Sequence, residues 1–306
     1  MGENAEGTTK GSSIARWWSE KARDISLPGL EGLTFHDLSV IFYTGIVKGT
    51  FSTRASAISY SFFMALFPFL LFMLNLIPFI SFIEDFQLEF LIFMDSLLPA
   101  ETRDFFNDIF LDIADKKRVG LLSIVFFFSI FLMANGVNSI FTSFEFSYHT
   151  KINRSIIRQY FVAVGISLIL AFLFLVTVAG TIYLTYFMED LKEAGVFSNA
   201  VRWTGLVRFL MLDILIYVGV ATLYYFGTKE GRLSRFFSVG ALFSTVLIVL
   251  TTFLFSLYID NFSNYNEIYG SIGALLILMG YIWINSNILL LGFELNASLL
   301  KLRKNK

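Results

Sequence analysis

Long apolar segments alternate with short polar ones along most of the chain. A helix needs roughly 20 mostly apolar residues to cross a bilayer. The pattern predicts an all-α, polytopic membrane bundle of six transmembrane helices, at residues 59–83, 119–141, 159–187, 206–226, 237–258 and 270–298. The third and sixth segments are long enough to favour tilting or overhang. The first contains Pro68 and Pro78, and prolines inside a span usually kink it.

Composition agrees with a membrane protein and excludes several other classes. Hydrophobic residues make up 56% and charged residues 15% of the 306 residues, whereas a soluble domain carries about 25% charged residues. The net charge of −1 provides no overall basic field for nucleic acid. The absence of cysteine excludes a disulfide framework and a thiolate metal site.

Basic residues near the predicted spans set an expected orientation. They concentrate before the first span, in 142–158, in 227–236 and in the C-terminal tail. Because Lys and Arg favour the cytoplasmic side, we expect both termini in the cytoplasm. The basic cluster 116–118, before the second span, is the exception.

The chain divides into a cytoplasmic tail with an interfacial helix (1–58), a six-helix membrane domain (59–300) and a short cytoplasmic tail (301–306). Residues 35–50 have helical apolar spacing, and suit either a helix in the membrane interface or one packed on the bundle's end. The periplasmic loop 84–118 is acidic and includes an amphipathic helix. A solvated acidic face is favoured there over a divalent-cation site, and no metal site or cofactor is predicted.

A polar stripe follows one side of the last span. Seven residues are close to two helical turns, so Gly273, Gly280, Asn287, Glu294 and Lys301 lie roughly in line. An ionised carboxylate is costly in an apolar medium. We therefore expect Glu294 at the cytoplasmic end, hydrogen-bonded to the first or second span, where it would line a polar vestibule.

The second span carries a matching face, at Asn135, Asn138, Thr142, Glu145 and His149. The spacing of three and four places these residues on one side of a helix. Each stripe alone is more typical of hydrogen bonds between helices. Because both stripes reach the same side of the membrane, a cytoplasmic cavity is slightly favoured.

Two further charged positions are candidates for a pathway. Arg54 begins the first span at the same end, and suits pairing with Glu294 or Glu145, an anionic head group, or a routine basic anchor. Asp213 lies inside the fourth span, where an ionisable residue suggests function by default. Arg208 is five residues away and therefore on another face of the helix.

Two longer motifs resemble a known family. "RASAISYSFFMALFPFLLF" (54–72) and "SLYIDNFSNYNEIYGSIGALLILMGYIWINSNILLLGFELNASL" (256–299) are similar to the two ends of the YihY/BrkB family of bacterial inner-membrane proteins. The motif positions are Pro68, Tyr265, Asn266, Tyr269, Gly270, Gly292 and Asn296. The resemblance implies six spans in the inner (cytoplasmic) membrane with cytoplasmic termini. Members have carried the name ribonuclease BN, a label regarded as misassigned, and others are linked to virulence and serum resistance.

These residues and the resemblance together indicate a function at the membrane, since a role in moving lipids has been proposed for relatives. We expect no enzyme activity, because the sequence offers no metal-binding carboxylate or histidine cluster facing the cytoplasm and no RNA groove. A transporter or flippase-like protein for a lipid or amphipathic anion in envelope biogenesis is favoured. Membrane lipids would be its partners, with a second copy of the chain or another envelope protein as further candidates. The alternatives are a non-transporting envelope scaffold or virulence factor and, least favoured, a ribonuclease.

Overall fold

The protein is described here from a computed structural model, covering residues 39, 40, 43, 51–76, 122–146, 155–193, 200–261 and 271–304. This part of the chain is helical. Its elements are α3 (Ser52–Leu76), α6 (Leu122–Glu145), α7 (Ile156–Glu193), α8 (Ala200–Gly227), the short 3-10 helix η3 (Glu230–Leu233), α9 (Val239–Asn261) and α11 (Ser271–Lys304). The predicted all-α fold is confirmed for these residues.

Five helices are long and apolar enough to cross a membrane, over Phe127–Glu145, Ile156–Met188, Gly205–Gly227, Val239–Tyr258 and Leu275–Lys301. The chain is therefore a multi-pass membrane protein. Helix α3 starts at Ser52, ahead of the first predicted span at 59–83, and includes Pro68. Residues 77–83 lie outside the described residues, and α3 is not among the five. Six spans thus remain a prediction.

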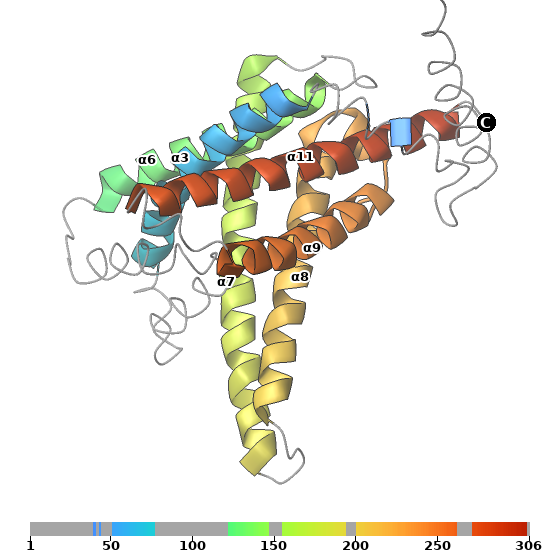
Figure 1. The fold of residues 1–306 in the computed structure, drawn as a ribbon. Helices are drawn as coiled ribbons and strands as arrows, with labels where there is room; N and C mark the ends of the chain where they lie inside the picture. Colours follow the sequence, from blue (N-terminus) through green and yellow to red (C-terminus); the bar gives the residue numbers. More distant parts are fainter. Residues whose placement is uncertain are drawn as a thin grey trace, which may run out of the picture.

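The helices form two groups (Figure 1). α7 and α8 run side by side as an antiparallel pair, and α3, α6 and α11 lie across the upper half of that pair. α3 packs between α6 and α11, α6 also contacts α7, and α9 packs on both α8 and α11. Helices α3, α7 and α9 begin, and α6, α8 and α11 end, at one end of the assembly. We call this the junction end.

Small residues and serine hydroxyls join the crossing helices. A methyl group added at Gly136 of α6 would lie 3.2 Å from Cβ of Ala65 in α3, which shows how closely these helices approach. Ser59 of α3 donates to the carbonyl of Met279 in α11 at 3.2 Å, and Ser139 of α6 donates to the carbonyl of Ala57 in α3 at 3.1 Å. Such contacts hold helices together where lipid offers no hydrophobic driving force.

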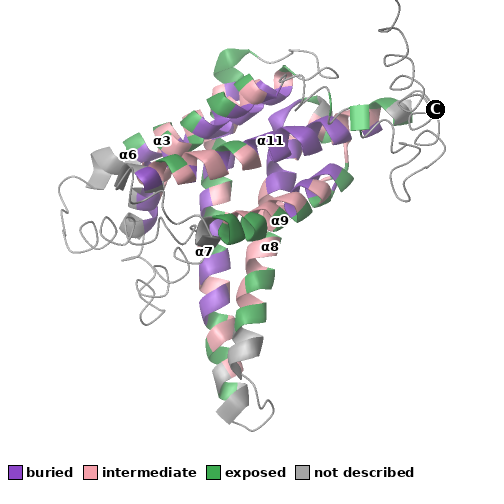
Figure 2. Ribbon diagram, in the orientation of Figure 1, coloured by how far each residue is buried: buried purple, intermediate pink, exposed green. Residues whose placement is uncertain are grey.

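Apolar packing continues along the helices in two clusters. The cluster at the junction end draws on α3, α6, α7, α8, α9 and α11. The second cluster combines the later part of α3 with α6, the middle of α7 and the beginning of α11. Figure 2 shows buried positions on the faces that the helices turn toward one another, with exposed positions along the outer faces of α8 and α9. Exposed apolar residues such as Val246, Leu250 and Phe253 are suited to contact with lipid.

Candidate functional site

Three aromatic rings form the centre of the junction end. Phe144, near the end of α6, stacks on Phe293 of α11 with ring centroids 4.1 Å apart and planes within 5°. Tyr224 of α8 meets both rings edge-on, at 5.6 Å from Phe144 and 5.8 Å from Phe293. All three side chains are buried. The ends of three helices are therefore fixed to one another by ring packing.

The Tyr224 hydroxyl links α8 to two further helices. It donates to the carbonyl of Leu289 in α11 at 2.7 Å, and its oxygen lies 2.7 Å from the Ser244 hydroxyl of α9. Because the tyrosine proton is donated to Leu289, the Ser244 proton is available to the Tyr224 oxygen and to the carbonyl of Ile288 in α11, which lies 3.4 Å away. Because every member is buried, removal of one would leave a polar atom without its partner.

Two glycines allow α9 and α11 to touch. A methyl group added at Gly292 would overlap the Ser244 hydroxyl and lie 2.6 Å from the Tyr224 oxygen. One added at Gly240 would overlap the carbonyl of Gly292 and lie 2.6 Å from the Asn296 side chain. Only glycine fits at either position. Gly292, the first residue of the family segment Gly-x-Glu-Leu-Asn (292–296), therefore serves this close crossing.

Asn296, the last residue of that motif, caps the beginning of α9. Its carbonyl oxygen accepts from the backbone N–H of Gly240 at 2.8 Å, and its amide nitrogen donates to the Ser238 hydroxyl at 2.7 Å. Ser238 in turn accepts a longer bond, 3.3 Å, from the N–H of Ala241. The first N–H groups of a helix lack partners within it, and a side chain from α11 supplies one here.

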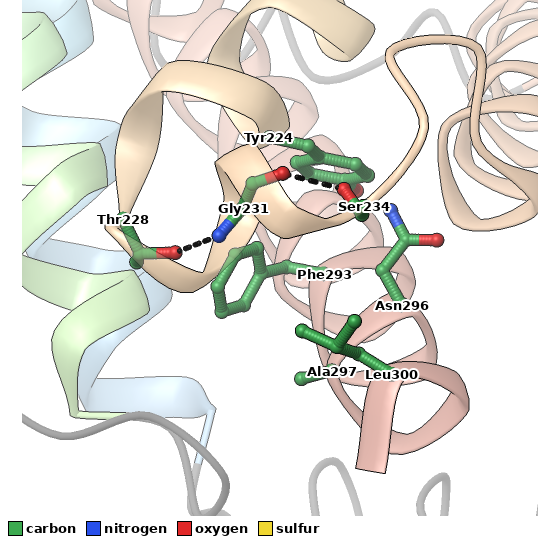
Figure 3. Close-up of a pocket in the computed structure, with 8 residues that line it drawn as sticks. All are labelled: Tyr224, Thr228, Gly231, Ser234, Phe293, Asn296, Ala297 and Leu300. Atoms are coloured by element: carbon green, nitrogen blue, oxygen red, sulfur yellow. Dashed lines mark hydrogen bonds between the residues drawn. The ribbon is translucent and has the colours of Figure 1, made fainter. Parts of the chain in front are cut away.

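A small hollow, partly open to the outside, lies against these residues. Figure 3 shows its lining, from the end of α8, the η3 turn and α11. Its polar groups are already used: Thr228 accepts from the N–H of Gly231, and Ser234 donates to the carbonyl of Gly231. Asn296 and Tyr224 have the partners described above. We therefore regard the hollow as part of the helix packing at the junction end, and not as a binding site.

A second polar group lies between α6 and α7. The side-chain amide of Gln159, in the first turn of α7, lies 3.1 and 3.2 Å from the two carboxylate oxygens of Glu145. We orient the amide so that its nitrogen donates to Glu145, because two oxygens would repel. Its oxygen then accepts from the Thr142 hydroxyl at 3.0 Å and lies 3.2 Å from the Asn138 side chain. Gln159 is buried, whereas Asn138, Thr142 and Glu145 are only half-buried.

Arg54 links α3 to α6 by a hydrogen bond. Its guanidinium donates to the carbonyl of Ser143 at 3.0 Å and lies 5.0 Å from the centre of the Phe51 ring. Ser143 precedes Phe144, so Arg54 stands beside the aromatic centre of the junction end. The structure thus places Arg54 at the same end as Glu145 and Glu294.

The stripe on α11 is largely buried. Glu294 is 4% exposed and Asn287 is 7% exposed, whereas Lys301 is exposed. Asn287 donates to the carbonyl of Trp283 in its own helix at 2.9 Å. The described side chains that pack between α3, α6 and α11 at this end are mainly apolar. A continuous polar groove there is not seen, and the half-buried polar residues lie between α6 and α7 instead.

The other predicted candidates are spread more widely. Asp213 is half-buried in α8, and no described residue hydrogen-bonds to its carboxylate; Asn135 is half-buried in α6. Pro68 is buried inside α3. His149, the loop 84–118, most of 35–50 and the motif positions Tyr265, Asn266, Tyr269 and Gly270 lie outside the described residues. Among the residues that are described, no three His, Cys, Asp or Glu side chains come together as metal ligands.

Sequence reasoning missed three residues that organise this end, namely Gln159, Tyr224 and Ser244. All three lie in mainly apolar helices, and none belongs to either polar stripe. An isolated buried polar group requires a partner, so each could have been marked as a helix contact. Which helix supplied the partner could not have been read from spacing.

Comparisons with known proteins agree with this picture. The chain is 27% identical over 255 residues to a Bacillus subtilis protein described as ribonuclease-like, YfkH, covering 82% of this chain and 91% of that protein. It is 25% identical over 194 residues to a UPF0761 membrane protein of Glaesserella parasuis, covering 63% of this chain and 65% of the relative. A UPF0761 membrane protein of Psychromonas ingrahamii is 34% identical over 116 residues, 38% of each chain. No solved structure matches.

The family described as Virulence factor BrkB matches residues 42–306, which include every helix at the junction end. The resemblance read from the two end motifs is thereby confirmed. The chain belongs to the BrkB family of membrane proteins.

Proposed function

We propose that this protein binds the polar head of a lipid or amphipathic anion between α6 and α7 and moves it between membrane leaflets. The carrying observation is a polar group inside or at the end of two candidate spans, made of buried Gln159 and the half-buried residues Asn138, Thr142 and Glu145. Polar groups at membrane depth are costly, and they usually turn toward partners or a wet path.

The chemistry of this group suits a head group that carries both hydrogen-bond donors and negative charge. Glu145, Asn138 and Gln159 offer acceptors for the hydroxyl or ammonium groups of a head group. Arg158, next to Gln159, is exposed and offers a cation to a phosphate. Acyl chains would remain in lipid along the exposed faces of the helices. Catalysis plays no part in this proposal, and neither does a cofactor.

The setting is proposed to be a bacterial inner membrane with both termini in the cytoplasm. The exposed cations Arg158, Lys229, Arg232, Arg235 and Lys301 all lie toward the junction end, which supports this end as the cytoplasmic one. In that orientation the α6–α7 group would receive its lipid from the cytoplasmic leaflet.

The test is lipid movement in proteoliposomes. A fluorescent phosphatidylglycerol is followed across the bilayer for the wild type, for Gln159→Leu and for a control, Tyr183→Phe, which removes an exposed hydroxyl on α7. We expect wild type and control to move the lipid faster than empty vesicles, and Gln159→Leu to slow it. Folded wild-type protein that moves lipid no faster than empty vesicles would contradict the proposal.

A non-transporting scaffold is the second candidate, favoured by one observation. The stack of Phe144 on Phe293 and the apolar residues around it pack α3, α6 and α11 tightly at the junction end. A protein that rocks between two states would have to break this packing. Absence of lipid movement together with capture of a specific envelope protein would support the scaffold.

A further inference from the structure

The turn between α8 and α9 lies where two candidate spans leave the membrane. One span ends at Gly227 and the next begins at Val239. The η3 helix, Glu230–Leu233, and the residues up to Ser238 fill the interval. The turn is therefore held at the membrane boundary by the two helices that it joins.

Two large apolar side chains project from this turn. Leu233 is 63% exposed and Phe237 is 62% exposed. Phe237 is not simply loose, because its ring packs against Phe236 at 5.0 Å and Tyr217 at 5.6 Å. A turn that faced only water would normally carry polar residues at such positions, so these side chains indicate a partly apolar neighbour.

Three exposed cations alternate with these apolar residues. Lys229, Arg232 and Arg235 are all exposed. The guanidinium of Arg232 lies 5.6 Å from the centre of the Phe226 ring, which holds it beside the end of α8. The sequence of the turn contains a single acidic residue, Glu230. The neighbour that fits is therefore negatively charged as well as apolar.

The turn is fixed before any partner arrives. Gly231 packs directly on the carbonyl of Tyr224, where a side chain would overlap it. Its N–H donates to Thr228 at 3.0 Å, and its carbonyl accepts from the N–H of Ser234 at 3.1 Å. A preorganised surface loses little conformational freedom on binding.

We propose that residues 229–237 bind the anionic phospholipids of the membrane in which the protein sits. Phosphate groups would meet Lys229, Arg232 and Arg235, while Leu233 and Phe237 enter the boundary between head groups and acyl chains. Basic residues next to a span attract anionic lipid, and interfacial apolar side chains add burial. This contact is separate from the α6–α7 group and does not depend on lipid movement.

The absence of cysteine allows a single label to test the proposal. Val239→Cys, beside Phe237 but leaving both apolar side chains intact, is labelled with an environment-sensitive fluorophore in the full-length protein. The protein is reconstituted in vesicles containing equal amounts of phosphatidylcholine and phosphatidylglycerol, with one or the other brominated as a quencher. Leu250→Cys on the outer face of α9 is the matched control.

We expect severalfold stronger quenching at position 239 by brominated phosphatidylglycerol than by brominated phosphatidylcholine. The preference for phosphatidylglycerol at position 239 should fall with added salt and disappear in the double variant Arg232→Gln/Arg235→Gln. A label at position 250 should be quenched equally by the two lipids. Equal quenching by the two lipids at position 239 would overturn the proposal. So would a preference that survives the double substitution. If quenching by both lipids is absent and an acidic peptide protects the label, the turn is a protein contact instead.

Discussion

Phe144 and Phe293 lie face to face, with centroids 4.1 Å apart and planes almost parallel, although 149 positions separate them in the sequence. The pair joins the end of α6 to α11. Each ring precedes a glutamate, Glu145 or Glu294, which sequence spacing had marked as a pathway candidate. The aromatic contact thus helps to position both carboxylates at the junction end.

Removal of this contact should weaken the whole junction end. Phe293→Ala would leave a cavity between Phe144 and Tyr224, and large-to-small changes of this kind cost about 3–5 kcal/mol. We expect a clear fall in the midpoint of thermal unfolding in detergent. Phe253→Ala, on the exposed face of α9, is the control and should change the midpoint little. Equal effects of the two substitutions would show that the stack adds no stability.

Gly292→Ala should be more disruptive than its small size suggests. The added methyl group would overlap Ser244 and press on the Tyr224 hydroxyl, so α9 and α11 would have to separate. Gly280→Ala in the same helix meets nothing within 4 Å and is the matched control. We expect the yield of folded, monodisperse protein to fall for Gly292→Ala alone. Normal yield and unfolding midpoint for Gly292→Ala would contradict the close crossing.

Asn296 should stabilise the beginning of α9 through both of its amide atoms. Loss of a helix cap costs about 0.5–2 kcal/mol, so Asn296→Leu should lower stability and speed hydrogen exchange at Gly240 and Ala241. Asn296→Asp keeps the acceptor for Gly240 but loses the donor to Ser238. Its stability should lie between that of the wild type and that of Asn296→Leu. Ser298→Ala is the control, because this residue lies two positions further along α11 and its hydroxyl forms no hydrogen bond with a described residue. If Asn296→Leu leaves exchange in the first turn of α9 unchanged, the cap is not formed.

The Tyr224 hydroxyl should contribute more to stability than the hydroxyl of Tyr225. Tyr224→Phe removes the donor to the Leu289 carbonyl and leaves Ser244 only its longer contact with the Ile288 carbonyl, 3.4 Å, at a cost of about 1–3 kcal/mol. Tyr225→Phe removes a hydroxyl for which no bond to a described residue is found. Unfolding midpoints of the two variants provide the comparison, and a similar shift in both would argue against the predicted role of the buried network.

Replacement of Asp213 should increase stability, whereas the substitutions above reduce it. This residue lies inside a candidate span without a hydrogen-bonding partner among the described residues, and an unpaired charge in an apolar medium is destabilising. We therefore expect Asp213→Asn to raise the unfolding midpoint. A lower midpoint would indicate a partner supplied by another part of the chain or by a second copy.

Sequence periodicity predicted the helices well because each buried helix is a long apolar run with few interruptions. The predicted segments 159–187, 206–226 and 237–258 lie within or close to α7, α8 and α9. Helix α3 begins before the predicted span at 59–83, because Arg54, Thr53 and the serines at 52 and 56 make residues 52–58 look like a polar flank. Hydrogen bonds from Arg54 to the Ser143 carbonyl and from Ser139 to the Ala57 carbonyl join that segment to α6 and make it part of the bundle.

The candidate site was harder to predict, because spacing within one helix does not reveal the helix that it faces. Asn138 and Glu145 were grouped correctly on one side of α6, but their contact Gln159 belongs to α7. Gly292 and Asn296 were recognised as motif residues, yet their roles depend on Gly240 and Ser238, 52 and 58 positions earlier. Such roles become visible only when the helices are packed.

The length of α7 has a consequence for the surrounding membrane. Its apolar stretch, Ile156–Met188, contains 33 residues, or about 50 Å of helix against a hydrocarbon layer of about 30 Å. A helix held upright at that length would force nearby lipid to stretch, so α7 and its companion α8 are expected to lean strongly. Hydrophobic mismatch of this size would make the protein sensitive to acyl-chain length and favour its residence in the thicker regions of a bilayer.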